Sequence, residues 1–197
     1  HLKILVACEY SGRVREAFRK MGHDAYSCDI LPSDDNSQYH FQEDVLNVIN
    51  REKWDMMIAF PPCTHLANSG ARWFKNKVKE QSEALDFIRF LMNADIPKIA
   101  IENPVGVIST KIRKPDQIIQ PYWFGDRARK TTCLWLKGLP NLEPTKMVEP
   151  DLVTYTRKDG TKVTFSSDYG GSGEGSGKRR SLTYQGIADA MASQWSC

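Results

Sequence analysis

The chain has 197 residues, of which 41% are hydrophobic, so it can bury one full core, and we expect one domain with a small appendage. Its 27 Lys and Arg residues against 24 Asp and Glu residues give a formal net charge of +3, which permits nucleic-acid binding without requiring it. No apolar run approaches the roughly 18 residues of a membrane span, and the five cysteines lack a Cys-x-x-Cys pair, so we expect a cytoplasmic protein without membrane contact, disulfide framework or bound metal.

The start of the chain predicts a strand, a turn, a helix and a second strand. Residues 3–8 are an apolar strand, Tyr10-Ser11-Gly12 is a turn, and residues 14–21 carry apolar side chains at helical spacing. The second strand, 24–28, ends at the acid Asp29. This layout is typical of a site for a nucleoside-bearing cofactor, in which the acid accepts the ribose hydroxyls.

The first turn also bears on the kind of cofactor. It holds one glycine, Gly12, whereas a dinucleotide site needs several to let the backbone approach a pyrophosphate. A cofactor without phosphates, such as S-adenosylmethionine, fits this turn better. Gly12 could equally serve only as a tight turn in any α/β protein, but Asp29 and the later Glu43-Asp44-Val45 favour the cofactor.

Two further apolar runs end in residues that can carry chemistry. Residues 54–58 precede the run Ala59-Phe60-Pro61-Pro62-Cys63-Thr64, and the double proline favours a rigid turn that presents a thiol nucleophile. The alternative is a packed core cysteine. A strand over 96–101 precedes Glu102-Asn103-Pro104, which indicates a buried carboxylate with a functional role and not a surface acid.

The remaining elements complete an α/β pattern. We predict a helix over 82–93 and a strand over 133–136, so that strands and helices alternate and build a mostly parallel sheet covered on both sides. Residues 68–77 are either a mobile loop that closes over a flipped base, with Arg72 near phosphates, or a solvated helix start. We interpret His65 as a substrate-loop residue and not as a metal ligand.

The character of the chain changes after residue 142. Residues 143–180 contain prolines, a turn at 158–161 and the glycine-serine tract 170–177, which together predict a flexible loop. An amphipathic helix over 185–195 then closes the chain. We therefore expect a catalytic, cofactor-binding domain at 1–142, a reduced recognition insertion at 143–180, and a segment at 181–197 whose helix packs back on the catalytic domain.

The chemistry-bearing motifs occur along the chain in this order: Tyr10-Ser11-Gly12, Asp29, Asp44, Pro62-Cys63, Glu102-Asn103 and Arg127-Ala128-Arg129. In this order the chain resembles the DNA cytosine carbon-5 methyltransferases, particularly the compact phage-type members. The match spans residues 3 to about 140, with a weaker echo at 181–195. The family's Phe-x-Gly-x-Gly motif keeps one glycine here, and the interval that usually holds its target-recognition domain is short.

The resemblance implies a class I, Rossmann-like methyltransferase that uses S-adenosylmethionine and acts on DNA. It implies that Cys63 is the catalytic nucleophile and that Glu102 grips the base. It implies that Arg127 and Arg129 complete the catalytic set by supporting the nucleophile and the substrate. It implies that the cofactor is bound by Cys8, Glu9, Tyr10, Ser11, Gly12, Asp29, Ile30, Asp44, Val45 and Pro61. It implies that the substrate is bound by Pro62, Thr64 and Asn103. Their charge adds Arg72, Lys178, Arg179 and Arg180 as substrate-binding residues near phosphates, and the alternative for Lys178, Arg179 and Arg180 is scattered surface charge.

The shortness of the interval 143–180 leaves the substrate open. A short loop can present few side chains to a groove, so we expect binding through phosphates, with little base readout, or target recognition supplied by a partner protein. RNA or a free nucleotide is an alternative substrate. A non-catalytic domain that binds nucleic acid or protein is the alternative to an enzyme.

Overall fold

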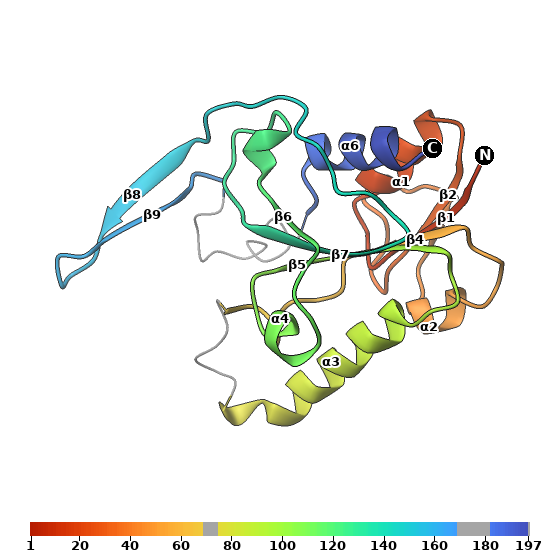
Figure 1. Ribbon diagram of the computed structural model, residues 1–197, viewed down its shortest axis with the longest axis horizontal. Helices are drawn as coiled ribbons and strands as arrows, with labels where there is room; N and C mark the ends of the chain where they lie inside the picture. The colour runs from red at the N-terminus through yellow and green to blue at the C-terminus, as the bar shows by residue number, and fades with distance from the viewer. Residues whose placement is uncertain (69–74, 169–181, 197) are drawn as a thin grey trace.

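The computed structural model describes residues 1–68, 75–168 and 182–196. Its centre is a seven-stranded sheet with the strand order β3-β2-β1-β4-β5-β7-β6 (Figure 1). The strands of this sheet are β1 (Lys3–Ala7), β2 (Asp24–Cys28), β3 (His40–Phe41), β4 (Met56–Ala59), β5 (Lys98–Pro104), β6 (Gln117–Ile119) and β7 (Thr132–Lys137). The helices are α1 (Arg13–Lys20), α2 (Val45–Val48), α3 (Val78–Met92), α4 (Ile108–Lys111) and α6 (Gln185–Trp195), with a 3-10 turn η2 (Pro121–Trp123).

The sheet is parallel over its first five strands. β1 pairs in parallel with β2 and β4, and the same orientation continues outward to β3 and β5. This order is the doubly wound arrangement of Rossmann-like folds. β7 lies between β5 and β6 and runs antiparallel to both. The prediction of an α/β fold with a mostly parallel sheet is therefore confirmed.

Helices cover both faces of the sheet because alternate residues of each buried strand point to opposite sides. In β1, Ile4 and Val6 belong to the core under α1 and α6, whereas Leu5 and Ala7 belong to the core under α2, α3 and α4. Figure 1 shows α1 and α6 on one side of the sheet and α3 and α4 on the other. All four side chains of β4 are buried, as expected for a central strand.

The last helix, α6, has the bounds 185–195 predicted from the sequence. Ile187, Met191 and Trp195 are buried in the core that α1 also covers. The helix begins in close contact with the chain before β7, because a Cβ on Gly186 would lie 2.0 Å from the carbonyl oxygen of Phe124. The C-terminal helix therefore packs on the same face of the sheet as α1.

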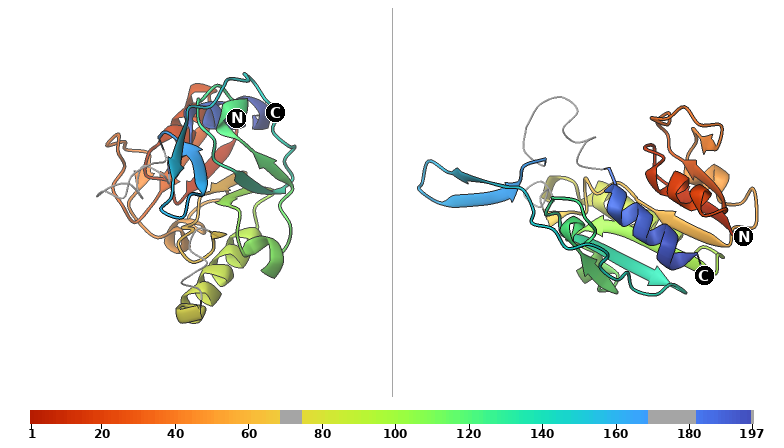
Figure 2. Two further views of the ribbon diagram at one scale, coloured as in Figure 1. Left: turned by 90° about the vertical axis from the view of Figure 1, so that its left-hand side faces the viewer. Right: turned by 90° about the horizontal axis from the view of Figure 1, so that it is seen from above.

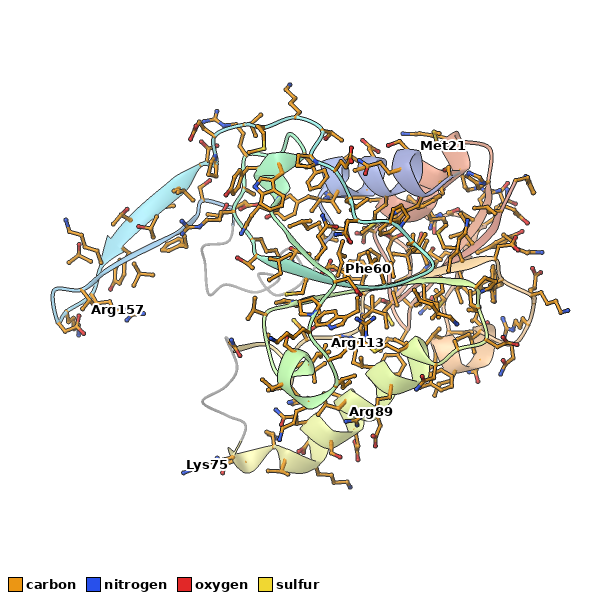
Figure 3. The ribbon with its side chains drawn as sticks, viewed as in Figure 1. Met21, Phe60, Lys75, Arg89, Arg113 and Arg157 are labelled. Atoms are coloured by element: carbon orange, nitrogen blue, oxygen red, sulfur yellow. The ribbon has the colours of Figure 1, made fainter. Side chains whose placement is uncertain are left out.

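The structure corrects the expected loop at 143–180. Its described part contains an antiparallel hairpin of β8 (Leu152–Thr156) and β9 (Lys162–Ser166), which forms a sheet of its own. The hairpin extends away from the body in Figure 1 and in the right-hand view of Figure 2, and Figure 3 places Arg157 at its far end. The two runs Leu-Val-Thr-Tyr-Thr and Lys-Val-Thr-Phe-Ser alternate as strands do. The glycine-serine tract 170–177 lies outside the described residues.

Two element bounds also differ from expectation in ways that affect the site. The strand expected over 96–101 is β5, which continues to Pro104, so Glu102 and Asn103 belong to a strand and not to the turn after it. Pairing with β7 extends the strand, because Glu102 lies opposite Leu134 and Asn103 opposite Cys133. The helix expected over 82–93 begins earlier, at Val78.

Candidate active site

The strand register brings four chain segments to one edge of the sheet. Ala7 is opposite both Cys28 and Ala59, and Ala59 is opposite Ile101. The residues that follow these positions therefore share one level at the carboxyl ends of the parallel strands, and these are Cys8, Asp29, Phe60 and Glu102. The strand order reverses between β1 and β4, the place where open α/β sheets bind their ligands.

The turn after β1 is built around a buried carboxylate. Glu9 is 4% exposed, and its side chain accepts hydrogen bonds from the backbone N–H of Val14 (3.0 Å) and Arg15 (3.3 Å). Burial raises the pKa of Glu9 to about 7, against the opposing effect of these two hydrogen bonds and of the Arg15 charge. Glu9 thus occupies N–H groups at the start of α1 that a phosphate would otherwise use.

Gly12 and Arg15 hold this turn in place. Gly12 has a φ of 79°, and a Cβ there would lie 2.5 Å from Nη2 of Arg15. The side chain of Arg15 is fully buried, donates to Oγ of Ser27 (2.7 Å) and forms an ion pair with Asp35. Oγ of Ser27 also hydrogen bonds to Nδ1 of His40 (2.8 Å). Sequence reasoning missed this network, because its members are distant in the chain and follow no motif.

Two acids flank the end of β1. Burial, the neighbouring Cys28 and the charges of Asp29 and Asp44 raise the pKa of the Cys8 thiol, so both carboxylates lie near it. Asp29 accepts a hydrogen bond from the N–H of Leu31 (2.8 Å) and is half-buried, and its burial raises its pKa. Asp44 caps α2 by accepting from the N–H of Leu46 (3.0 Å).

The other residues predicted to hold the cofactor differ in how they are presented. Tyr10 and Pro61 are buried, Ser11 accepts a hydrogen bond from the N–H of Arg13 (3.2 Å), and the side chain of Ile30 is 72% exposed. Val45 is 3% exposed and belongs to the core. Val45 therefore offers little surface to a ligand, whereas most of Ile30 is exposed.

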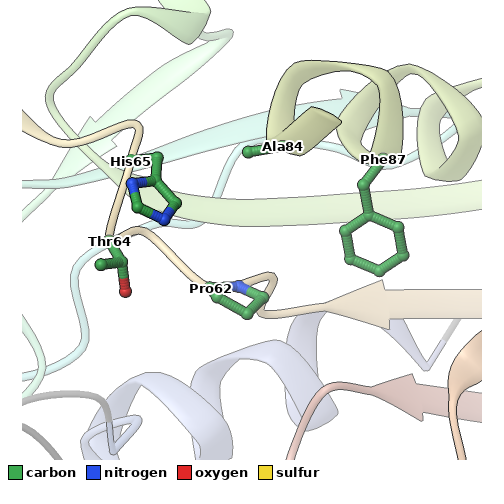
Figure 4. Close-up of a pocket in the computed structure, with 5 residues that line it drawn as sticks. All are labelled: Pro62, Thr64, His65, Ala84 and Phe87. Atoms are coloured by element: carbon green, nitrogen blue, oxygen red, sulfur yellow. The ribbon is translucent and has the colours of Figure 1, made fainter. Parts of the chain in front are cut away.

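Cys63 lies in the turn after β4. Cys63 is partly exposed between the exposed residues Pro62 and Thr64, and its carbonyl accepts from the N–H of Leu66 and of Ala67, each at 3.0 Å. An open hollow of about 260 Å³ lies between this turn and α3. Figure 4 shows His65 and Pro62 on one side of it and Ala84 and Phe87 of α3 on the other.

Asn103 joins the end of β5 to this turn. The side chain is 1% exposed, and its Nδ2 donates to the carbonyl oxygen of Pro61 (3.0 Å). Its Oδ1 is buried and accepts no hydrogen bond within the described part of the chain. Gly106 adds a second close contact, because a Cβ there would lie 1.8 Å from the carbonyl oxygen of Leu66. The Cys63 turn and the end of β5 are thus fixed to each other.

Glu102 faces a lysine that sequence reasoning did not assign to the active site. Burial raises the pKa of Glu102, and the nearby charge of Lys130 lowers it in part. The backbone N–H of Lys130 donates to Oε1 of Gln120 (2.9 Å), which fixes the segment just before β7. The sequence does place Lys130 as a third cation directly after the Arg-x-Arg motif. Its position near Glu102, however, follows only from the pairing of β5 with β7.

The two arginines expected beside the nucleophile are both engaged by the hairpin. Arg127 forms an ion pair with Asp151 (2.8 Å) and donates to the carbonyl oxygen of Glu149 (3.2 Å). Nη2 of Arg129 donates to the carbonyl oxygen of Thr164 (2.7 Å). In this structure Arg127 therefore holds the segment that leads into β8, Arg129 holds β9, and Lys130 supplies the charge that acts on Glu102.

Four residues assigned to substrate binding, namely Arg72, Lys178, Arg179 and Arg180, lie outside the described residues. Within the described ranges, no group of three or more His, Cys, Asp or Glu side chains is arranged to hold a metal ion. No helix among these residues has the length and apolar character needed to cross a membrane.

Comparisons with known proteins place the fold. Neither models of known protein families nor the sequences of curated proteins match the chain. Among solved structures, the Entamoeba histolytica methyltransferase EhMeth is similar, with 15% identity and a TM-score of 0.56 over 75% of this chain and 58% of that one. A second similar structure is an E. coli protein assigned as a DNA modification methyltransferase encoded within a prophage, with 16% identity and a TM-score of 0.46 over 77% and 53%.

The chain thus spans a little over half the length of these two neighbours. At these identities the likeness concerns the fold, and the predicted fold class, a Rossmann-like methyltransferase fold with a mostly parallel sheet, is confirmed.

Proposed function

We propose that this chain transfers a methyl group from S-adenosylmethionine to carbon 5 of a cytosine in DNA through a covalent bond to Cys63. The observation that carries the proposal is the hydrogen bond of 3.0 Å by which Asn103, the residue after Glu102 on β5, joins the carbonyl oxygen of Pro61 in the Cys63 turn. The order of motifs along the chain and the fold shared with a methyltransferase support it.

The edge of β1 and β2 fits S-adenosylmethionine better than a dinucleotide. Glu9 already binds the first free N–H groups of α1, so a pyrophosphate there would meet a buried carboxylate. Asp29 would accept the ribose hydroxyls, Ile30 would contact the adenine, and the backbone from Cys8 to Gly12 would hold the amino-acid part. When bound, the cofactor supplies an electrophilic methyl group on a sulfonium sulfur.

Cys63 makes carbon 5 of the ring reactive. Its thiolate forms a bond to carbon 6, the double bond between carbons 5 and 6 breaks, and the electron pair becomes available at carbon 5. After carbon 5 has accepted the methyl group, it loses its proton to a base, the double bond re-forms and the bond from carbon 6 to sulfur breaks. The thiolate of Cys63 is thereby regenerated.

Glu102 and Lys130 act on the opposite side of the ring. Because burial raises its pKa, Glu102 can keep a proton and share it with ring nitrogen 3 while the thiolate adds. Lys130 opposes this effect of burial and so sets the pH at which that proton is lost. Asn103 positions the Cys63 turn through Pro61 and touches no reacting atom in this scheme.

A transfer assay with methyl-labelled S-adenosylmethionine tests the proposal on four substrates: duplex DNA, single-stranded DNA, RNA and dCMP. We expect label in DNA with wild type and none with Cys63→Ser, while binding of S-adenosylhomocysteine, measured by calorimetry, stays unchanged in the variant. Labelling of dCMP or RNA alone would contradict the assignment to DNA. Cofactor binding without transfer to any substrate would favour a non-catalytic binding domain.

A further inference from the structure

The two long edges of the β8–β9 hairpin differ in how the chain covers them. The body covers the edge of β9, because Nη2 of Arg129 donates to the carbonyl oxygen of Thr164 (2.7 Å) and the N–H of Arg129 donates to Oγ of Ser166 (3.1 Å). Lys162 places a charge at the start of the same strand. The edge of β8 lacks this protection within the described ranges, where β8 pairs with β9 alone and all of its residues are exposed.

The hydrogen bonds of the hairpin show which backbone groups of β8 face outward. The N–H of Ser167 donates to the carbonyl oxygen of Asp151 (2.9 Å), and the N–H of Arg157 donates to that of Thr161 (2.7 Å). In an antiparallel ladder every second residue bonds to the partner strand, so the odd-numbered residues of β8 bond to β9. The N–H and C=O groups that point away from β9 are therefore those of Leu152, Thr154 and Thr156.

The composition of β8 leaves this outer edge open to another strand. Sheet edges that stay unpaired are usually blocked by a lysine, a proline or a bulge. β8 has the sequence Leu-Val-Thr-Tyr-Thr, without charge or proline, and its register with β9 runs without a bulge. Val153 and Tyr155 are 43% and 58% exposed and lie on one face, opposite Phe165 and Val163. An open edge and an exposed apolar face thus meet on one strand.

The charges at the two ends of β8 indicate what pairs with it. Two acids precede the strand and two cations follow it, namely Glu149, Asp151, Arg157 and Lys158. Asp159 lies beyond them and is held by hydrogen bonds within the turn. A strand that is negative at its start and positive at its end is complementary to its own copy when the two run antiparallel, whereas a parallel copy would bring like charges together. The charge pattern therefore favours a second copy of this chain.

We propose that two copies of this chain form a dimer in which β8 pairs antiparallel with β8 of the second copy, about a two-fold axis at Thr154. In this register Thr154 faces its own counterpart and Leu152 faces Thr156 of the copy, so every outward N–H and C=O group of the strand gains a partner. Two hairpins, each only marginally stable alone in water, become one four-stranded sheet. The hairpin extends away from the body, which leaves it accessible to the copy (Figures 1 and 2).

The same register also matches the side chains. Val153 lies beside Tyr155 of the copy, so the two apolar faces join into one. These are non-hydrogen-bonded positions of the new ladder, where opposed side chains come closest. Arg157 lies beside Asp151 of the copy, and the Asp151 carboxylate, which already pairs with Arg127 of its own chain (2.8 Å), then bridges the two arginines.

The test measures molar mass by sedimentation equilibrium from about 1 μM to about 100 μM protein. We expect wild type to rise toward twice the mass of one chain. Thr154→Pro removes the outward N–H at the two-fold axis, so this variant should keep the mass of one chain throughout. Thr164→Pro is the matched control on the edge of β9. It removes the same hydroxyl contact between Thr154 and Thr164 (3.1 Å) and should dimerise as wild type does.

A second pair of variants tests the charges. Arg157→Glu places a like charge beside Asp151 of the copy at both symmetric positions, so the dissociation constant should rise about tenfold. Lys158→Glu makes the same change of net charge one residue further on, in the turn, and should stay close to wild type. Thermal melting followed by circular dichroism confirms that each variant is folded.

A third pair tests the register. Thr154→Cys places a thiol opposite its own counterpart, with α-carbons roughly 5.5 Å apart, which suits a disulfide. Copper phenanthroline should therefore cross-link this variant into a dimer. Thr156→Cys is the control, because its counterparts lie four residues apart along the paired strands and cannot be bridged. Wild type gives the background from the native cysteines.

The β8 dimer is overturned if wild type keeps the mass of one chain at about 100 μM. It is also overturned if the two proline variants dimerise alike, which would place the interface elsewhere, or if the cross-link forms at position 156 and not at 154. None of these measurements involves methyl transfer. A failed dimer therefore leaves the proposed reaction at Cys63 standing, and a chain without transferase activity leaves the dimer standing.

Discussion

Replacing Glu9 with Gln should remove a strong pH dependence from the stability of the protein. The pKa of Glu9 rises from 4.5 to about 7 on folding because the carboxyl is buried. Below pH 4.5 Glu9 is protonated in both states. As the pH rises, the unfolded chain ionises first and the folded chain keeps its proton until about pH 7, so the unfolded state binds fewer protons and stability falls.

The size of this loss follows from the two pKa values. At about 1.4 kcal/mol for each pH unit between them, ionisation of buried Glu9 costs about 3 kcal/mol of folding free energy. Glu9→Gln has no proton to lose and keeps an oxygen that can accept from the N–H of Val14 or Arg15. Wild type should therefore lose stability relative to the variant up to about pH 7 and then stay at a constant difference.

Urea unfolding of both proteins from about pH 5 to about pH 8 measures this difference directly. Glu83→Gln, which alters an exposed carboxylate on α3, is the control and should follow wild type at every pH. A free-energy difference between wild type and Glu9→Gln that stays the same over the whole range would show that Glu9 is not a buried acid with a raised pKa.

Further expected outcomes concern the reaction edge. Lys130→Met removes the charge that lowers the pKa of Glu102, so the loss of activity that accompanies ionisation of Glu102 should move to higher pH, and a pH–rate profile that does not move would contradict this pairing. Asp29→Ala should weaken S-adenosylmethionine binding by ~1–3 kcal/mol in calorimetry, and wild-type affinity would show that the ribose site is wrongly placed. Gly106→Ala should cost ~1–3 kcal/mol in thermal unfolding, since the new Cβ would meet the carbonyl oxygen of Leu66, and unchanged stability would contradict that contact.

The strands and helices of the body could be predicted because their signals are local. Apolar runs gave β1, β4 and β7, and the helical spacing of apolar residues gave α1 and α6. The hairpin was missed although its signal was present, since Leu152–Thr156 and Lys162–Ser166 alternate around a turn that contains Asp159-Gly160. The abundance of glycine and serine just after it favoured a loop for the whole interval.

The site was harder to predict because its contacts join distant parts of the chain. The positions of Cys63 and Glu102 after two apolar runs can be read from the sequence, but the hydrogen bond from Asn103 to Pro61 depends on the pairing of β4 with β5. The partner of Glu102 depends in the same way on the pairing of β5 with β7, which selects Lys130. Nothing local indicates that the neighbouring arginines turn toward the hairpin.

Covalent trapping at Cys63 tests the central claim most directly. A duplex that carries 5-fluorocytosine has no proton to lose at carbon 5, so the bond from carbon 6 to sulfur cannot break after methyl transfer. Wild type with S-adenosylmethionine should give a denaturant-resistant protein–DNA adduct that maps by peptide mass spectrometry to Cys63, and Cys63→Ser should give none. Methylation of ordinary duplex DNA by the Cys63→Ser variant, or an adduct at another residue, would contradict the account.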